Sequence, residues 1–99
     1  MYNYEQGDII KVDGLAHPAL VISNDFFNSS GKARVCPILS AAIEGPLHIY
    51  VESKRTKGFV LCEQIKYVDL KKRAFNPIGR ISYFDMINIA DAIQGIFEY

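Results

Sequence analysis

The stretch GDIIKVDGLAHPALVIS, residues 7–23, contains the two strands and the turn on which the prediction of the fold depends. GDIIKVD (residues 7–13) mixes β-branched and polar residues, as a half-buried strand does, and Gly14 follows it. ALVIS (residues 19–23) is an apolar run short enough to be a buried strand. The intervening GLAHP is therefore predicted to be a turn between two strands.

Further short strands are expected along the chain, separated by turns that contain Gly or Pro. They are predicted at residues 33–39, 47–52, 58–65 and 66–70. NDFFN (residues 24–28) is predicted to be a turn or a one-turn helix, and Pro37 argues for an edge position, a bulge or a strand end. Many short strands of this kind predict a mainly β fold, a small barrel of about six strands.

The C-terminal part changes to a helical period, with one helix expected over residues 83–98. Ser82 is a suitable N-cap, and Asp85 follows three residues later. The apolar residues at spacings of three and four are Met86, Ile89, Ala90, Ile93, Ile96 and Phe97. We expect this apolar stripe to pack on the barrel.

The length of 99 residues, with 49% of them apolar, predicts a single domain over residues 1–99 with one modest core. A subunit interface would supplement so small a core, so a homo-oligomer is expected. No apolar run approaches the roughly 20 residues of a membrane span, and no basic segment precedes an apolar one at the N-terminus. These features predict a cytoplasmic protein without a membrane partner. Cys36 and Cys62 lack metal-ligand spacing and are expected to be buried free thiols.

The net charge is zero, which argues against nucleic-acid binding through bulk charge. Basic residues nevertheless gather in residues 53–73, with Lys54 and Arg55 in the predicted hairpin SKRTKG. Such a segment either follows phosphates or forms ordinary solvated loop surface, and the sequence leaves both interpretations open.

Motifs for phosphate loops, zinc proteases, metal-binding cysteine pairs and serine hydrolases are absent from the sequence, so no metal site is predicted. His17 lies in a turn flanked by Gly and Pro, where it is either a proton-transfer group or a loop histidine without a role. His48 is out of phase with the apolar residues of LHIYVE and is expected to face outward. Tyr67, Phe26 and Phe27 suit stacking on bases, although core or dimer packing is preferred for the two phenylalanines.

Four segments taken together, GDIIKVDGLAHPALVISNDFFN, VCPIL, GFVLCEQIKYVDLKKR and the terminal helix, resemble the MazF/PemK toxin family in order and spacing. The family pattern is roughly GDI-x-x-V, then RP-x-L-V-x-S, a strand ending in P-I-T, and G-V-L-x-x-Q-I-x-x-x-D. The resemblance extends over nearly the whole chain. It implies an SH3-like barrel of the CcdB and MazF type with a C-terminal helix.

The resemblance also implies an activity and its partners. It suggests a homodimeric toxin of a type II toxin–antitoxin system, which cleaves single-stranded RNA at specific sequences without a metal ion or cofactor. An acidic antitoxin segment would neutralise it by lying across the RNA groove. In such enzymes the RNA 2′-hydroxyl attacks the adjacent phosphate, so the site needs proton transfer and positive charge.

The residues implied as catalytic depart from the family pattern. His17 stands before Pro18, where the family has its catalytic arginine, and a histidine can transfer a proton but lacks the guanidinium fork. Leu39 stands where the family has its catalytic threonine, and the next residue, Ser40, is the nearest hydroxyl. Because neighbours on a regular strand face opposite ways, Ser40 serves the site only if the strand end is shifted or bulged.

Other positions are implied to bind RNA. Gln64 and Lys66, in CEQIK, match the motif whose glutamine lines the RNA groove, and Asn24 matches a frequent asparagine for which an Asx-turn is an equal explanation. Lys54 and Arg55, from the basic segment of residues 53–73, are expected to contact RNA phosphates. The family's GSEQ loop is shortened here to Gly-Leu-Ala, residues 14–16.

Three hypotheses for function follow from these observations. The preferred one is a toxin endoribonuclease with a divergent site that uses His17 and Ser40. The second is a non-catalytic dimer that keeps affinity for RNA or antitoxin, since lost transition-state contacts depress chemistry more than binding. The third is a protein-directed toxin of the CcdB type, because fold alone does not determine function.

Overall fold

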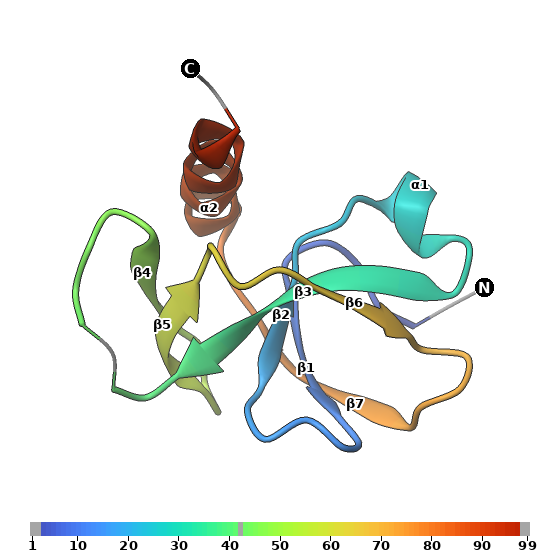
Figure 1. Ribbon diagram of the computed structural model, residues 1–99. Coiled ribbons are helices and arrows are strands. Elements are labelled where there is room, and N and C mark those ends of the chain that lie inside the picture. The colour runs from blue at the N-terminus through green and yellow to red at the C-terminus, as the bar shows by residue number, and fades with distance from the viewer. Residues whose placement is uncertain (1–2, 42, 98–99) are drawn as a thin grey trace.

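Strands account for most of the regular structure in the computed structural model, which describes residues 3–41 and 43–97 (Figure 1). The strands are β1 (Asp8–Val12), β2 (Ala19–Val21), β3 (Lys32–Leu39), β4 (His48–Glu52), β5 (Lys57–Leu61), β6 (Lys66–Asp69) and β7 (Phe75–Arg80). The helices are α1 (Asp25–Asn28) and α2 (Tyr83–Ile96). The mainly β fold with a C-terminal helix is therefore confirmed, with one strand more than the six expected within the described residues.

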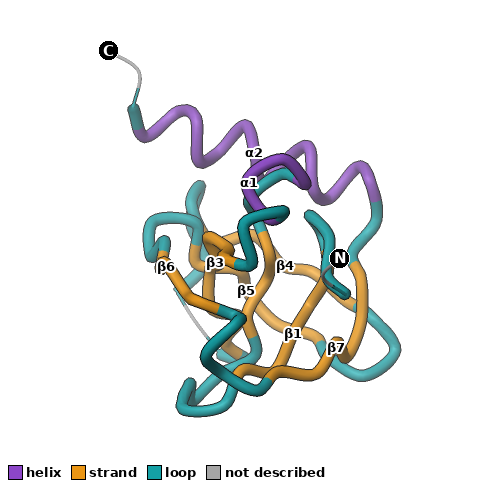
Figure 2. Tube along the Cα trace, turned by 90° about the vertical axis from the view of Figure 1, so that its right-hand side faces the viewer, coloured by secondary structure: helices purple, strands orange, loops and turns teal. Residues whose placement is uncertain are grey.

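The strands form one antiparallel sheet in the order β4-β5-β3-β2-β1-β7, and β6 pairs with β3. Figure 2 shows the strands curled into an open barrel, with both helices on the same side of it. Short antiparallel connections allow neighbours in sequence to become neighbours in the sheet, as for β1 with β2 and β4 with β5.

Strand β3 is the central strand of the sheet, so of the three alternatives for Pro37 (an edge position, a bulge or a strand end) the edge position is wrong. β3 pairs with β2 along one edge, and along the other it pairs with β6 over residues 32–35 and with β5 over residues 38–39. The Ile38 N–H donates to the Pro18 carbonyl at 2.8 Å on the β2 side, so the ring nitrogen of Pro37 faces the other edge. It falls in the gap between β6 and β5, where no partner needs a donor.

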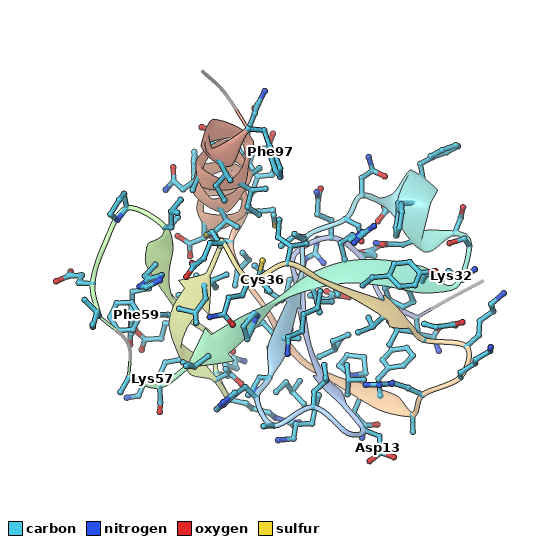
Figure 3. All side chains as sticks on the ribbon, viewed as in Figure 1. Asp13, Lys32, Cys36, Lys57, Phe59 and Phe97 are labelled. Atoms are coloured by element: carbon cyan, nitrogen blue, oxygen red, sulfur yellow. The ribbon has the colours of Figure 1, made fainter. Side chains whose placement is uncertain are left out.

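The core consists of two clusters, one on each side of the curled sheet, and β3 contributes to both. The first contains Tyr4, Ile10, Val12, Ala19, Val21, Ala33, Val35, Val68 and Leu70. The second contains Ile9, Leu20, Cys36, Ile38, Val51, Val60, Cys62, Ile81 and Ile89. Cys36 and Cys62 are buried free thiols, as the sequence predicted. Figure 3 shows Cys36 in the middle of the molecule, between the sheet and α2.

Helix α2 begins as predicted, because the Ser82 hydroxyl accepts a hydrogen bond from the Asp85 N–H at 3.1 Å. Ile89 is its fully buried residue and anchors the helix on the second cluster. Burial of one such side chain contributes about 1.5–3 kcal/mol. The other helix residues on this cluster are Met86, Ala92 and Ile93, whereas Ala90, Ile96 and Phe97 of the predicted stripe are exposed. Glu98, the expected last residue, lies outside the described residues.

Strand β7 and the end of β5 differ most from the expectation. Strand β7 was not predicted, because Pro77 and Gly79 interrupt its sequence and an apolar alternation is missing. It forms because it pairs with β1 along its length, at the end of the sheet where a proline costs little. Strand β5 ends at Leu61, four residues before its predicted end, because the Gln64 N–H donates a hydrogen bond back to the Leu61 carbonyl at 3.1 Å.

No helix within the described residues is long and apolar enough to cross a membrane.

Candidate functional site

A small cavity of about 60 Å³ brings together two of the residues selected from the sequence. His17 and Lys66 line it, and both are exposed to solvent. Its remaining lining residues are apolar and comprise Leu15, Ala16, Ala19, Val35 and Pro37. The two polar side chains therefore share a cavity with an otherwise apolar lining, and no acidic side chain lines it to neutralise them.

Strand register explains how two residues so far apart in sequence meet here. Ala19 of β2 lies opposite Pro37 of β3, and Lys66 of β6 lies opposite Val35 of β3. Directly opposite residues share a face of the sheet, as do residues two apart on one strand. His17 precedes Ala19 by two residues, so the β1–β2 loop and β6 flank the same face of β3 from its two edges.

The two positions that depart from the family pattern are neighbours in space. Ala19 pairs with Pro37, and the Pro18 carbonyl accepts from the Ile38 N–H, so continuing this register places His17 opposite Leu39. This register relates the two backbone positions, while Leu39 is not among the residues that line the cavity of His17.

Ser40 directly follows β3 and is exposed, but it does not line the cavity that contains His17. The end of the strand keeps a regular register, with Leu39 opposite Phe59. Strand alternation then directs the Ser40 side chain to the other face. The catalytic role of Ser40 stays a prediction.

Gln64 lies in the turn between β5 and β6, two residues before Lys66, and its side chain is exposed. The β3–β6 ladder ends at Lys66 and Val35, and Gln64 is not among the residues that line the cavity of His17 and Lys66. The glutamine of the CEQIK motif therefore lies in the turn that leads into β6.

Lys54 and Arg55 lie in the β4–β5 turn and line a separate cavity of about 590 Å³ together with Arg80 of β7. A Cβ at Gly79 would lie 2.6 Å from Ser53 Oγ, so this turn packs closely on β7. Arg80 Nη1 lies 2.6 Å from Asp8 Oδ1 and 3.4 Å from Glu5 Oε2, which compensates its charge. The structure therefore sets Lys54 and Arg55 apart from the cavity of His17.

Asn24 caps α1, since its side-chain oxygen accepts from the Phe27 N–H at 3.0 Å. It lines a third cavity, between α2 and the N-terminal segment, which contains neither His17 nor Lys66. The capping role accounts for an asparagine at this position. The structure does not bring Asn24 to the other selected residues.

His48 and Glu63 form an ion pair that the sequence did not reveal, because His48 begins β4 whereas Glu63 lies in the turn after β5. His48 Nε2 lies 3.0 Å from Glu63 Oε2, and the Ile43 carbonyl accepts from Nδ1. The Ile43 carbonyl and the Glu63 carboxylate raise the pKa of His48, and the hydrogen bond from His48 lowers the pKa of Glu63. Both ring nitrogens are occupied, so His48 has no nitrogen free to exchange a proton with a substrate.

Tyr67 is half-exposed and lies opposite Arg34 in the β3–β6 register, with the guanidinium carbon 5.1 Å from the ring centroid. It remains accessible for stacking on the side of β6 opposite Lys66. Phe26 is 90% exposed, so core packing within this chain was a wrong expectation for it, and Phe27 is also exposed.

Within residues 3–41 and 43–97, no group of three or more His, Cys, Asp or Glu side chains is placed to hold a metal ion.

Two comparisons of the sequence with known proteins identify the same kind of relative. The family model of the PemK-like, MazF-like toxin of type II toxin–antitoxin systems matches residues 5–97. The endoribonuclease toxin ChpB of Escherichia coli K12 is 33% identical, over 77% of this chain and 78% of that protein.

Solved structures share the fold at lower sequence identity. A MazE–MazF complex from Deinococcus radiodurans superposes with a TM-score of 0.86 at 19% identity, covering 97% of both chains. A mycobacterial endoribonuclease in complex with its cognate antitoxin gives a TM-score of 0.83 at 16% identity, covering 98% of this chain and 99% of that one. The match to the family model and the relationship to ChpB show that this chain belongs to the PemK-like, MazF-like toxin family of type II toxin–antitoxin systems.

Proposed function

We propose that this chain is a toxin that cleaves single-stranded RNA at specific sequences without a metal ion. Membership of the toxin family and the relationship to an endoribonuclease toxin support this reaction. The single structural observation that carries it is the cavity lined by His17 and Lys66. It combines a proton-transfer group with a cation, which are the two requirements for attack on a phosphodiester.

The proposed reaction needs no atom beyond RNA, the protein and water. The RNA 2′-oxygen bonds to the adjacent phosphorus while the bond from phosphorus to the 5′-oxygen breaks. The 2′-hydroxyl proton passes to the His17 imidazole, and the departing 5′-oxygen takes a proton from water. Gln64, two residues before Lys66, is proposed as a supporting hydrogen-bonding group. Ser40 is proposed to join it only if the end of β3 shifts.

Binding of RNA is proposed to extend over the remaining selected residues. Gln64 and Lys66 would hold nucleotides near the cut, and Asn24, Lys54 and Arg55 would contact the RNA farther along the strand. The chain would act as one domain in a cytoplasmic homodimer, and an acidic antitoxin would neutralise it. Solved complexes of family members with antitoxins support such a partner.

A non-catalytic RNA-binding or antitoxin-binding dimer is the second candidate, and Leu39 favours it. The side chain opposite His17 is aliphatic and offers no hydrogen bond to a transition state. The loss of such a contact depresses the chemical step more than binding.

Incubation of the protein with a long single-stranded RNA in excess EDTA, followed by gel electrophoresis, tests the proposal. We expect discrete fragments with the unmodified protein and with the matched surface variant Lys11→Ala, and intact RNA with His17→Ala. Intact RNA in every lane, from protein that is folded by circular dichroism, would support the second candidate instead.

A further inference from the structure

Lys66 and His17 are the titratable side chains of their cavity, and they reach it from opposite edges of β3. The acids nearest to Lys66 in sequence are Glu63 and Asp69, each three residues away, and the Glu63 carboxylate is held by His48 at 3.0 Å. Asp69, at the other end of β6, accepts a hydrogen bond from the Lys71 N–H at 3.0 Å. The positive charge of Lys66 is therefore available to a ligand in the cavity.

The proposed reaction needs more than His17 can supply alone. A histidine that accepts the 2′-hydroxyl proton must begin the step neutral, so it offers no positive charge to the phosphate at that moment. Leu39, the residue opposite His17, offers neither charge nor a hydrogen bond. A permanent cation within reach of the same phosphate is missing unless another side chain provides it.

We infer that the Lys66 ammonium binds the non-bridging oxygens of the scissile phosphate and stabilises the charge that develops on them during attack. Lys66 and His17 thus each meet one of the two requirements of the reaction, which are charge stabilisation and proton transfer. His17 moves the proton, and Lys66 neutralises the phosphorane-like transition state. The inference rests on the proposed function and names the phosphodiester as the ligand of this cavity.

The apolar lining of the cavity strengthens the interaction of the Lys66 ammonium with a phosphate. Val35 and Pro37 line the cavity beside Lys66, and their side chains offer no hydrogen bond that would anchor water beside the ammonium. A compact charge with three donors acts more strongly on a phosphate where competing water is scarce. An ammonium also tolerates the changing geometry of the phosphorus centre, because its donors have no fixed plane.

Single-turnover cleavage at saturating protein concentration separates this role from simple binding. We expect Lys66→Ala to lower the maximal cleavage rate by about 100-fold to 1,000-fold, as loss of one transition-state donor does, while RNA affinity changes only a few-fold. Lys66→Arg should recover most of the rate, and Lys66→Gln should not. The matched variant Lys11→Ala should cleave like the unmodified protein.

A second variant series tests the division of work. His17→Arg restores a guanidinium at the position, so Lys66→Ala should cost less than about tenfold in that background, in contrast to its effect beside His17. An equal cost in both backgrounds would overturn the shared role.

The two proposals fail in distinguishable ways. If the unmodified protein cleaves RNA and Lys66→Ala keeps the same maximal rate, or loses only affinity, the role of Lys66 is overturned and the proposed function stands. If the unmodified, folded protein leaves RNA intact, both are overturned. Circular dichroism and thermal unfolding of each variant establish that the exposed side chain can be replaced without loss of the fold.

Discussion

Gly58 of β5 lies directly against the backbone carbonyl of Leu39 at the end of β3. A Cβ at Gly58 would be 2.5 Å from the Leu39 carbonyl oxygen and 2.9 Å from its carbon. Since Leu39 lies opposite His17 in the extended register, this close approach of two backbones also supports one side of the candidate site.

Gly58→Ala is therefore expected to destabilise the protein by about 1–3 kcal/mol, because one of the two strands must move to admit the methyl group. Equilibrium unfolding in urea measures the change. Gly45→Ala is the matched control, since a Cβ there meets no atom within 4 Å. Equal unfolding midpoints for the two variants would contradict the close contact.

The pair of His48 and Glu63 should make stability depend on pH. The raised pKa of His48 means that its contribution is complete at low pH and is lost as pH rises through that value. The lowered pKa of Glu63 means that its contribution is present at higher pH and is lost as pH falls through that value. The pair therefore stabilises most in the window between the two pKa values.

Thermal unfolding of the protein and of His48→Gln across this range measures the effect. The difference in Tm should be greatest in mildly acidic solution and should shrink as the solution becomes alkaline. The side chains are 24% and 37% exposed, so added salt should reduce it further. A Tm difference that does not change with pH would show that the imidazole is neutral in the fold.

Lys54 and Arg55, in the β4–β5 turn, should contribute to the salt dependence of RNA binding. With His17→Ala to prevent cleavage, the logarithm of affinity should fall linearly with the logarithm of salt concentration. Lys54→Ala and Arg55→Ala should each reduce that slope by about 0.7, the value for one lost contact to a single strand. A slope equal to that of Lys11→Ala would assign the turn to ordinary solvated surface.

Cys36 and Cys62 should resist thiol reagents in the native protein. Burial raises the pKa of Cys36 to about 12 and that of Cys62 to about 11, so neither forms a thiolate near neutral pH. A disulfide reagent that reports thiolate absorbance should label neither residue until denaturant is added. Rapid labelling under native conditions would reveal local opening between the sheet and α2.

Local sequence was sufficient for several features of this protein. The capping of α2 by Ser82 and the positions of β1 and β2 depend on residues within a few positions of one another, and they were predicted. The family pattern in the sequence was sufficient for the fold class and the relationship to toxins. Strand β7 was missed because only its pairing with β1, more than 60 residues away, stabilises a segment that contains Pro77 and Gly79.

Only the tertiary structure determined which residues come together in the site. His17 and Lys66 were selected separately from the sequence, and no spacing could show that they share a cavity, because β3 lies between them. The ion pair of His48 with Glu63 and the separation of Asn24 from His17 were hidden for the same reason. Periodicity predicts which residues form a strand, but the register between distant strands determines which side chains meet, and that register depends on packing across the whole barrel.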